Sequence, residues 1–173
     1  MQPVVFDPAG LRVGQGYDVH AFAEGRRLIL GGVDIPHARG LLGHSDADVL
    51  AHAISDALLG GIRGGDIGKL FPDTDPAYKG ADSLKLLAAV ADKVRAEGYD
   101  ILDVDSVIAA QAPKLSPYRE AMRENLAAAM GIAVEDVGVK ATTTEHLGFE
   151  GREEGISATA VCILFRRSDE QRN

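Results

Sequence analysis

The sequence predicts a single domain of the α+β or α/β class, and three observations support this prediction. Its 173 residues suit one domain, because domains most often contain about 100–150 residues. Three segments carry apolar residues at helical spacing between residues that cap helices. Short apolar runs typical of strands lie before, between and after these helices. Because a strand, a helix and a strand follow one another after Leu102, we expect part of the sheet to be parallel.

The first part of the chain predicts a strand and a hairpin. Residues 1–10 have no clear period, so we expect them to form a loose tail. Residues 12–20 predict a strand that contains Gly14 and Gly16. Glycines inside a strand indicate close approach of another backbone or a bulge. Residues 27–35 form two short apolar runs around a Gly-Gly pair, which predicts a hairpin.

Three helices follow from their capping residues. The first is predicted for residues 45–59, where Ser45 and Asp48 have the spacing of a capping box, with Asp in place of the commoner Glu or Gln. The second is predicted for residues 82–97. The third is predicted for residues 116–131, because it opens with a serine and then a proline at the first helical position. A glycine stands at or just after the end of each segment, as expected at a helix C-terminus.

The remaining strands are predicted for residues 102–110, 137–143 and 156–165. The last of these contains Cys162, the only cysteine, which we expect to be a small buried apolar residue. Residues 60–80 are rich in Gly, Asp and Pro. About twenty irregular residues inside a compact domain are usually functional or mobile.

Charge and composition exclude several functions. The 18 basic and 26 acidic residues give a net charge of −8, whereas a sequence-independent nucleic-acid binder needs a basic surface. No apolar run approaches the roughly 20 residues that span a bilayer, and the first residues do not resemble a signal peptide. We therefore expect a cytoplasmic protein with one domain at residues 11–166 and a charged tail at 167–173.

Two segments carry candidate metal ligands. Asp18 and His20 are two residues apart on a predicted strand, so they point the same way about 7 Å apart. Asp48, His52 and Asp56 form one stripe on the first helix, where a carboxylate is available to orient the imidazole. Two imidazoles and one carboxylate suit Zn²⁺ with an open fourth position, which is the catalytic pattern. A solvated polar stripe is the alternative, and sequence spacing alone does not bring the strand and helix together.

Three further segments are candidate functional segments, and the first and third of them are candidates for binding phosphate. Residues 43–46 lie at the start of the first predicted helix, where free N–H groups favour anions, although capping by Ser45 would also explain them. Residues 141–145 end a strand with three threonines and a glutamate, for which strand packing is the alternative. Residues 148–155 are too polar for a core, and Arg152 would bind phosphate or pair with a neighbouring carboxylate.

Four motifs give the chain a resemblance to a known family. Residues 16–22 (GYDVHAF), 43–48 (GHSDAD), 65–75 (GDIGKLFPDTD) and 142–145 (TTTE) resemble those of the 2-C-methyl-D-erythritol 2,4-cyclodiphosphate synthases. The motifs occur in the family's order and spacing, and the resemblance extends over residues 12–165. It implies an α+β fold with a mixed sheet and helices on one face, assembled as a homotrimer whose active sites lie at the subunit interfaces.

The resemblance also implies the cofactors. Asp18, His20 and His52 would bind one Zn²⁺ per subunit. Glu145 would hold a second divalent cation, Mg²⁺ or Mn²⁺, between the two phosphorus centres of the diphosphate. The bound cations would then meet a phosphate-rich substrate despite the negative net charge.

The resemblance assigns the remaining site residues. His44 and Thr143 would stabilise the transition state, and Ser45 would contact the substrate. Residues 110–116 would form a cytidine pocket, and residues 71–75 would lie over the methylerythritol. Asp66 and Gly68 would reach the substrate from the neighbouring subunit. The substrate contacts implied are Asp18, His20, His44, Ser45, Asp66, Gly68, Phe71, Asp73, Asp75, Ala110, Ala112, Pro113, Lys114, Leu115, Thr142, Thr143, Glu145, Phe149 and Arg152.

The activity implied is that of a phosphorus–oxygen lyase of isoprenoid biosynthesis, which cyclises 4-diphosphocytidyl-2-C-methyl-D-erythritol 2-phosphate and releases CMP. A zinc phosphoesterase is one alternative, in which metal-bound hydroxide attacks a phosphate ester. A second alternative is a trimeric sensor that binds an isoprenoid diphosphate in a central cavity near Arg152. His37 and His146 have no assigned role, and we expect both at the surface.

Overall fold

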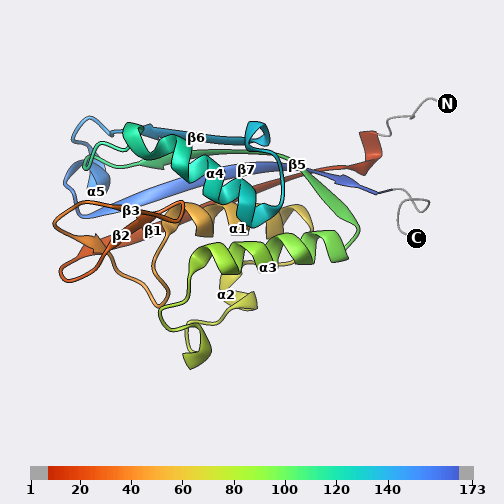
Figure 1. Cartoon of the computed structure of the whole chain (residues 1–173), viewed down its shortest axis with the longest axis horizontal. Coiled ribbons are helices and arrows are strands. Elements are labelled where there is room, and N and C mark those ends of the chain that lie inside the picture. Colours follow the sequence, from red (N-terminus) through yellow and green to blue (C-terminus); the bar gives the residue numbers. More distant parts are fainter. Residues whose placement is uncertain (1–7, 168–173) are drawn as a thin grey trace.

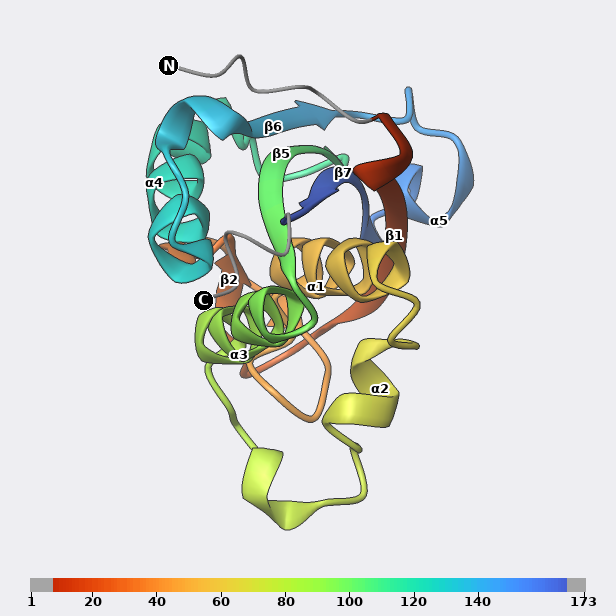
Figure 2. The same ribbon diagram turned by 90° about the vertical axis from the view of Figure 1, so that its right-hand side faces the viewer.

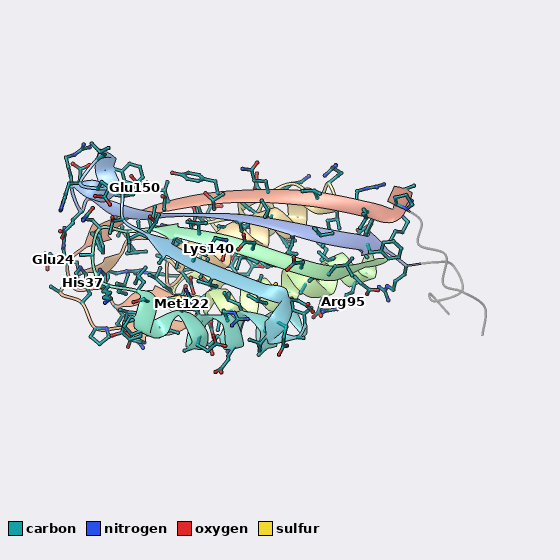
Figure 3. The ribbon with its side chains drawn as sticks, turned by 90° about the horizontal axis from the view of Figure 1, so that it is seen from above. Glu24, His37, Arg95, Met122, Lys140 and Glu150 are labelled. Atoms are coloured by element: carbon teal, nitrogen blue, oxygen red, sulfur yellow. The ribbon has the colours of Figure 1, made fainter. Side chains whose placement is uncertain are left out.

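The computed structural model describes residues 8–167. A five-stranded sheet has the order β4-β1-β7-β5-β6, and its long strands lie side by side when viewed from above (Figure 3). Only β5 and β6 are parallel; the other neighbours are antiparallel. The mixed sheet and the helices confirm the α+β class. The bounds of the strands are Leu11–Ala23 (β1), Leu28–Leu30 (β2), Val33–Ile35 (β3), Gly40–Leu41 (β4), Tyr99–Ala109 (β5), Val137–Thr142 (β6) and Gly155–Arg166 (β7).

Three long helices cover one face of the sheet (Figures 1 and 2). They are Val49–Gly61 (α1), Ser83–Ala96 (α3) and Arg119–Met130 (α4), and two short helices are Ile67–Leu70 (α2) and Gly148–Gly151 (α5). The even-numbered residues of β7 from Ile156 to Leu164 face the helices and are buried. They form the core together with the apolar faces of α1, α3 and α4.

The opposite face of the sheet, here called the open face, carries exposed apolar side chains. Val13, Tyr17 and Val19 of β1 and Val161 and Ile163 of β7 are between 39% and 63% exposed. None of the three long helices packs against this face (Figure 2). A row of large apolar side chains in contact with water indicates an interaction surface.

Most predicted elements are confirmed, with differences at their ends. The hairpin 27–35 is present as β2 and β3, and the third helix ends at Gly131 in the left-handed conformation that glycine allows. Its predicted start at residue 116 is instead a 3-10 turn, with α4 beginning at Arg119. Residues 60–80 contain α2 and a second 3-10 turn, and they project from the body of the molecule (Figure 2).

The termini differ in part from the prediction. Pro8–Gly10 form a 3-10 turn with Gly10 buried, where a loose tail was expected. The backbone N–H of Arg167 donates to the carbonyl of Gly98, so the first residue of the predicted C-terminal tail is bound to the domain. The rest of both predicted tails lies outside the described residues. No helix within residues 8–167 has the length and apolar character needed to cross a membrane.

Candidate metal centre and adjoining pockets

The site is built where β1 and α1 meet. A Cβ atom at Gly16 would lie 1.9 Å from the carbonyl oxygen of Ala53, and one at Gly14 would lie 1.8 Å from that of Ala57. Only glycine therefore allows the strand to lie directly on the helix backbone, which confirms the predicted close approach. Asp18 continues the same face of β1, and His52 is the neighbour of Ala53 on α1.

This contact brings together the three predicted zinc ligands. Asp18 Oδ2 lies 3.0 Å from His20 Nε2 and 3.1 Å from His52 Nδ1, and the two ring nitrogens are 3.2 Å apart. Two ligands about 2.0–2.1 Å from a tetrahedral ion are separated by about 3.3 Å. The three distances therefore match the edges of one face of a tetrahedron, so the residues fit a divalent metal.

The outer nitrogen of each imidazole has its own partner. His20 Nδ1 donates to the carbonyl oxygen of Leu42 at 2.8 Å. His52 Nε2 lies 2.8 Å from the hydroxyl of Ser83 and 3.2 Å from that of Ser45. When the outer nitrogens, His20 Nδ1 and His52 Nε2, carry the ring protons and donate them to these partners, the lone pairs of the inner nitrogens point into the site.

Electrostatics at the site favour an ionised Asp18. Burial raises the pKa of Asp18, but the contacts of its carboxylate with the imidazoles of His20 and His52 outweigh it and lower the pKa to about 2. Burial lowers the pKa of His20, but its hydrogen bond to Asp18 prevails and raises the pKa above 6.5. In the absence of a metal, a proton on His20 thus supplies the positive charge that Asp18 attracts.

The structure corrects the prediction for the start of the first helix. Asp48 is the N-cap and is fully buried, and its carboxylate accepts the backbone N–H groups of Gly31, Gly32 and Ala51. The predicted capping box from Ser45 is therefore wrong, because the helix begins four residues later. Asp48 does not orient His52, and the buried, carboxylate-capped first turn of α1 is not a free phosphate site.

The other carboxylate of the predicted stripe is also used within the fold. Asp56 Oδ1 accepts the backbone N–H of Ile67 at 2.7 Å, which anchors α2 to α1. Of the stripe, only His52 reaches the metal site. The residues that orient it come from other segments.

A cavity of about 380 Å³ adjoins the metal ligands. Several residues predicted to contact the substrate line this cavity together with His20 and His52. The other lining residues are Gly43, His44, Ser45, Ile67, Gly68, Phe71, Asp73, Tyr78 and Leu86. Ile67, Tyr78 and Leu86 were not predicted as site residues, because their apolar or aromatic character is ordinary for core positions.

Residues 60–80 form one wall of this cavity. His44 Nε2 donates to the carbonyl of Asp75 at 3.1 Å, and the backbone N–H of Gly80 donates to the carbonyl of His44 at 2.8 Å. The rings of Phe71 and Tyr78 meet edge to face, 5.2 Å between centroids. The carboxylates of Asp66 and Asp75 cap the short helices of this wall by accepting backbone N–H groups.

A second pocket, of about 260 Å³, lies between the loop after β5 and the end of β6. It contains most of the residues predicted for the cytidine pocket together with the end of the threonine motif. The lining residues are Ala110, Gln111, Pro113, Lys114, Leu115, Ser116, Ala141, Thr142 and Thr143. Leu115 is buried and Lys114 is exposed.

The two pockets lie at the same end of the sheet. Asp18 of β1 is level with Ala158 of β7, Ile108 of β5 and Ala141 of β6. Three strand spacings of about 4.8 Å separate the first from the last, or about 14 Å. Within residues 8–167, Asp18, His20 and His52 form the one cluster of metal-binding side chains, and Glu145 is not part of it.

The remaining candidates lie near the ends of β6 and β7. Glu145 is exposed, with Thr143 Oγ1 3.4 Å from its carboxylate. Arg152 is exposed and pairs with Glu154 at 2.9 Å, and Phe149 is half-buried. His146 is exposed as expected, and His37 is partly exposed beside the ring of Phe22.

Fold and site together define an α+β protein with a candidate metal centre of two histidines and one carboxylate beside a cavity. The chain belongs to the YgbB family, whose model matches residues 11–165. The 2-C-methyl-D-erythritol 2,4-cyclodiphosphate synthase of Geotalea uraniireducens is 62% identical over 157 residues, covering 91% of this chain and 100% of that protein.

Solved structures show the same fold. The bifunctional IspDF of Campylobacter jejuni matches with a TM-score of 0.88 and 45% identity; the match covers 91% of this chain and 43% of that protein. A CDP complex of Plasmodium falciparum IspF matches with a TM-score of 0.80 and 34% identity, covering 94% of this chain and 100% of that one.

Proposed function

We propose that the protein converts 4-diphosphocytidyl-2-C-methyl-D-erythritol 2-phosphate to 2-C-methyl-D-erythritol 2,4-cyclodiphosphate and releases CMP. This is the cyclodiphosphate-forming step of the non-mevalonate (MEP) pathway of isoprenoid biosynthesis, catalysed by a phosphorus–oxygen lyase. The observation that carries the proposal is the cluster of Asp18, His20 and His52 beside a cavity, in a chain whose relatives bear the name of this synthase. A cytoplasmic location is part of the proposal.

The two pockets suit the two ends of this substrate. The cavity beside His20 and His52 would hold the diphosphate and methylerythritol, with Phe71 and Asp73 in its wall. The second pocket would hold the cytidine, where backbone groups of the loop after β5 read the edge of the base. Lys114, exposed at the rim of this pocket, would then reach the phosphates. The CDP complex of the Plasmodium falciparum relative supports a cytidine nucleotide as ligand.

We propose a homotrimer in which each active site combines the metal pocket of one subunit with the cytidine pocket of its neighbour. The two pockets of one chain are three strands apart at the same end of the sheet. The open face carries exposed apolar side chains that include Tyr17, Val161 and Ile163, as expected of a surface that packs against other subunits. An isoprenoid diphosphate is a candidate ligand for a central cavity near Arg152.

The reaction requires no protein nucleophile. An oxygen of the 2-phosphate attacks the β-phosphorus, and the bond from that phosphorus to the CMP oxygen breaks with its electrons leaving on CMP. The protein folds the substrate so that these atoms meet, which replaces an encounter between separate molecules. His44 and Thr143 would donate hydrogen bonds where negative charge increases.

Asp18, His20 and His52 would hold Zn²⁺, which when bound acts as a Lewis acid on a phosphoryl oxygen. Glu145 would hold Mg²⁺ or Mn²⁺. A single exposed carboxylate suits such an ion, because Mg²⁺ is commonly held by one or two carboxylates together with water and substrate phosphates.

The test is to incubate the protein with the cytidylyl substrate, Zn²⁺ and Mg²⁺ and to identify the products by mass spectrometry. The proposal predicts CMP and the cyclic diphosphate in equal amounts. Inorganic phosphate or a linear product would instead indicate a zinc phosphoesterase. Binding of the substrate without release of CMP would indicate a sensor.

A further inference from the structure

The outer nitrogen of His52 leads into a chain of polar groups, of which Ser83 is buried and Asp46 half-buried. His52 Nε2 points away from Asp18 and His20, and its nearest partner is the hydroxyl of Ser83, at 2.8 Å. Ser83 is the first residue of α3 and is fully buried. The hydroxyl of Ser45 lies farther from the same nitrogen, at 3.2 Å, and accepts the backbone N–H of Ala47.

The hydroxyl of Ser83 is in turn bound to a carboxylate. Ser83 Oγ donates its proton to Asp46 Oδ1. The backbone N–H groups of Ser83 and Asp48 also donate to Asp46, at 3.1 Å and 3.2 Å. Three donors therefore hold the carboxylate of Asp46 in one orientation.

The direction of these hydrogen bonds follows from the number of protons. A serine hydroxyl donates one proton, and the carboxylate of Asp46 accepts it. Ser83 Oγ must then accept from His52, so the ring proton of His52 is on Nε2. This leaves the lone pair of Nδ1 facing Asp18 and His20.

We propose that Asp46 and Ser83 are positioning residues that fix the tautomer and ring orientation of His52 for metal binding. The carboxylate acts on the imidazole through the hydroxyl and makes Nδ1 a stronger base. The inference rests on the proposed function only in taking Zn²⁺ as the ion. His20 is held differently, by the backbone carbonyl of Leu42, so His52 is the ligand whose support depends on side chains.

The test compares Ser83→Ala with the matched control Ser55→Ala. Ser55 is also a fully buried serine, on the same helix as His52, and its hydroxyl donates to the carbonyl of Ala51 at 2.8 Å. The zinc dissociation constant is measured by competition with a chromogenic chelator, and the unfolding midpoint of the metal-free protein is measured in urea.

We expect Ser83→Ala to bind zinc about 10–100-fold more weakly than the wild type, which is the usual effect of losing a residue that orients a metal ligand. Zinc binding by Ser55→Ala should be unchanged within about twofold. Ser83→Thr keeps the hydroxyl and restores binding. Asp46→Asn keeps an acceptor oxygen but loses the charge, so its zinc affinity falls between those of the wild type and Ser83→Ala.

Zinc binding by Ser83→Ala within about twofold of the wild type overturns the inference, and so does an equal loss in Ser55→Ala. The inference is also overturned if the loss of zinc affinity across the variants is fully explained by a lower urea midpoint of the metal-free protein. Failure of the proposed function has a different signature: the weaker binding by Ser83→Ala is seen, but the wild type releases no CMP.

Discussion

His20 Nε2 and His52 Nδ1 face each other at 3.2 Å, and the outer nitrogen of each ring is bound to another group. Two lone pairs at this distance repel unless a proton or a metal ion lies between them. A proton at this position would relieve the repulsion in the metal-free protein, and a metal ion has to replace it.

This replacement makes zinc binding depend on pH. The hydrogen bond to Asp18 prevails over burial and raises the pKa of His20 above 6.5, so part of the protein carries the proton near pH 7. Below the raised pKa, zinc affinity falls by up to about tenfold per pH unit for one proton displaced. Calorimetry at pH 7 in two buffers of different ionisation enthalpy measures the proton released. Binding without proton release at pH 7 would contradict the protonated His20.

Removing a ligand should remove the metal. We expect His52→Ala and Asp18→Ala to weaken zinc binding by more than about 100-fold, because changing a residue that only orients a metal ligand already costs about 10–100-fold. Both variants should also lose CMP release. Metal analysis after dialysis measures the bound zinc. Asp34→Ala is the control, since this exposed carboxylate pairs with Arg27 away from the cluster. Full zinc occupancy in both ligand variants would show that the assignment is wrong.

The contact of β1 with α1 should tolerate only glycine. In Gly16→Ala the new methyl group would lie 1.9 Å from the Ala53 carbonyl oxygen, so the helix must shift. We expect a loss of about 2–3 kcal/mol in the free energy of unfolding and weaker zinc binding, because His52 moves with the helix. Gly60→Ala is the matched control on α1, with its nearest neighbour at 3.5 Å. Urea denaturation of the metal-free proteins measures the difference, and equal stability of the two variants would refute this account.

The open face should control assembly. We expect Val161→Glu to convert a trimer to monomers, because it places a charge in the exposed apolar row. Zinc binding should survive, since the metal ligands lie on one chain, while CMP release is lost. Light scattering after gel filtration gives the mass, with Lys85→Glu on the exposed side of α3 as control. A wild type that is monomeric at micromolar concentration would contradict the trimer.

Local patterns predicted most of the fold. The apolar spacing of α3 and the glycine after α4 depend on residues a few positions apart, and both were confirmed. Asp48 was misread because its partners Gly31 and Gly32 are 17 and 16 residues away in sequence. A buried carboxylate with distant partners looks like an ordinary polar helix residue in the sequence.

The candidate site was predictable only in part. The motifs identified Asp18, His20 and His52, but only the packing of β1 on α1 shows that their ligand atoms lie together. Ser83 was missed because a serine after the N-cap Asp82 is ordinary in the first turn of a helix. Its contact with His52 arises from the packing of α3 against α1, which no local pattern encodes.

The most direct test of the central claim is the product analysis by mass spectrometry. Incubated with the cytidylyl substrate, Zn²⁺ and Mg²⁺, the wild type is predicted to form CMP and the cyclic diphosphate in a 1:1 ratio, and His52→Ala to form neither. Release of inorganic phosphate, formation of a linear product, or substrate binding without CMP would contradict a cyclising phosphoryl transfer at this site.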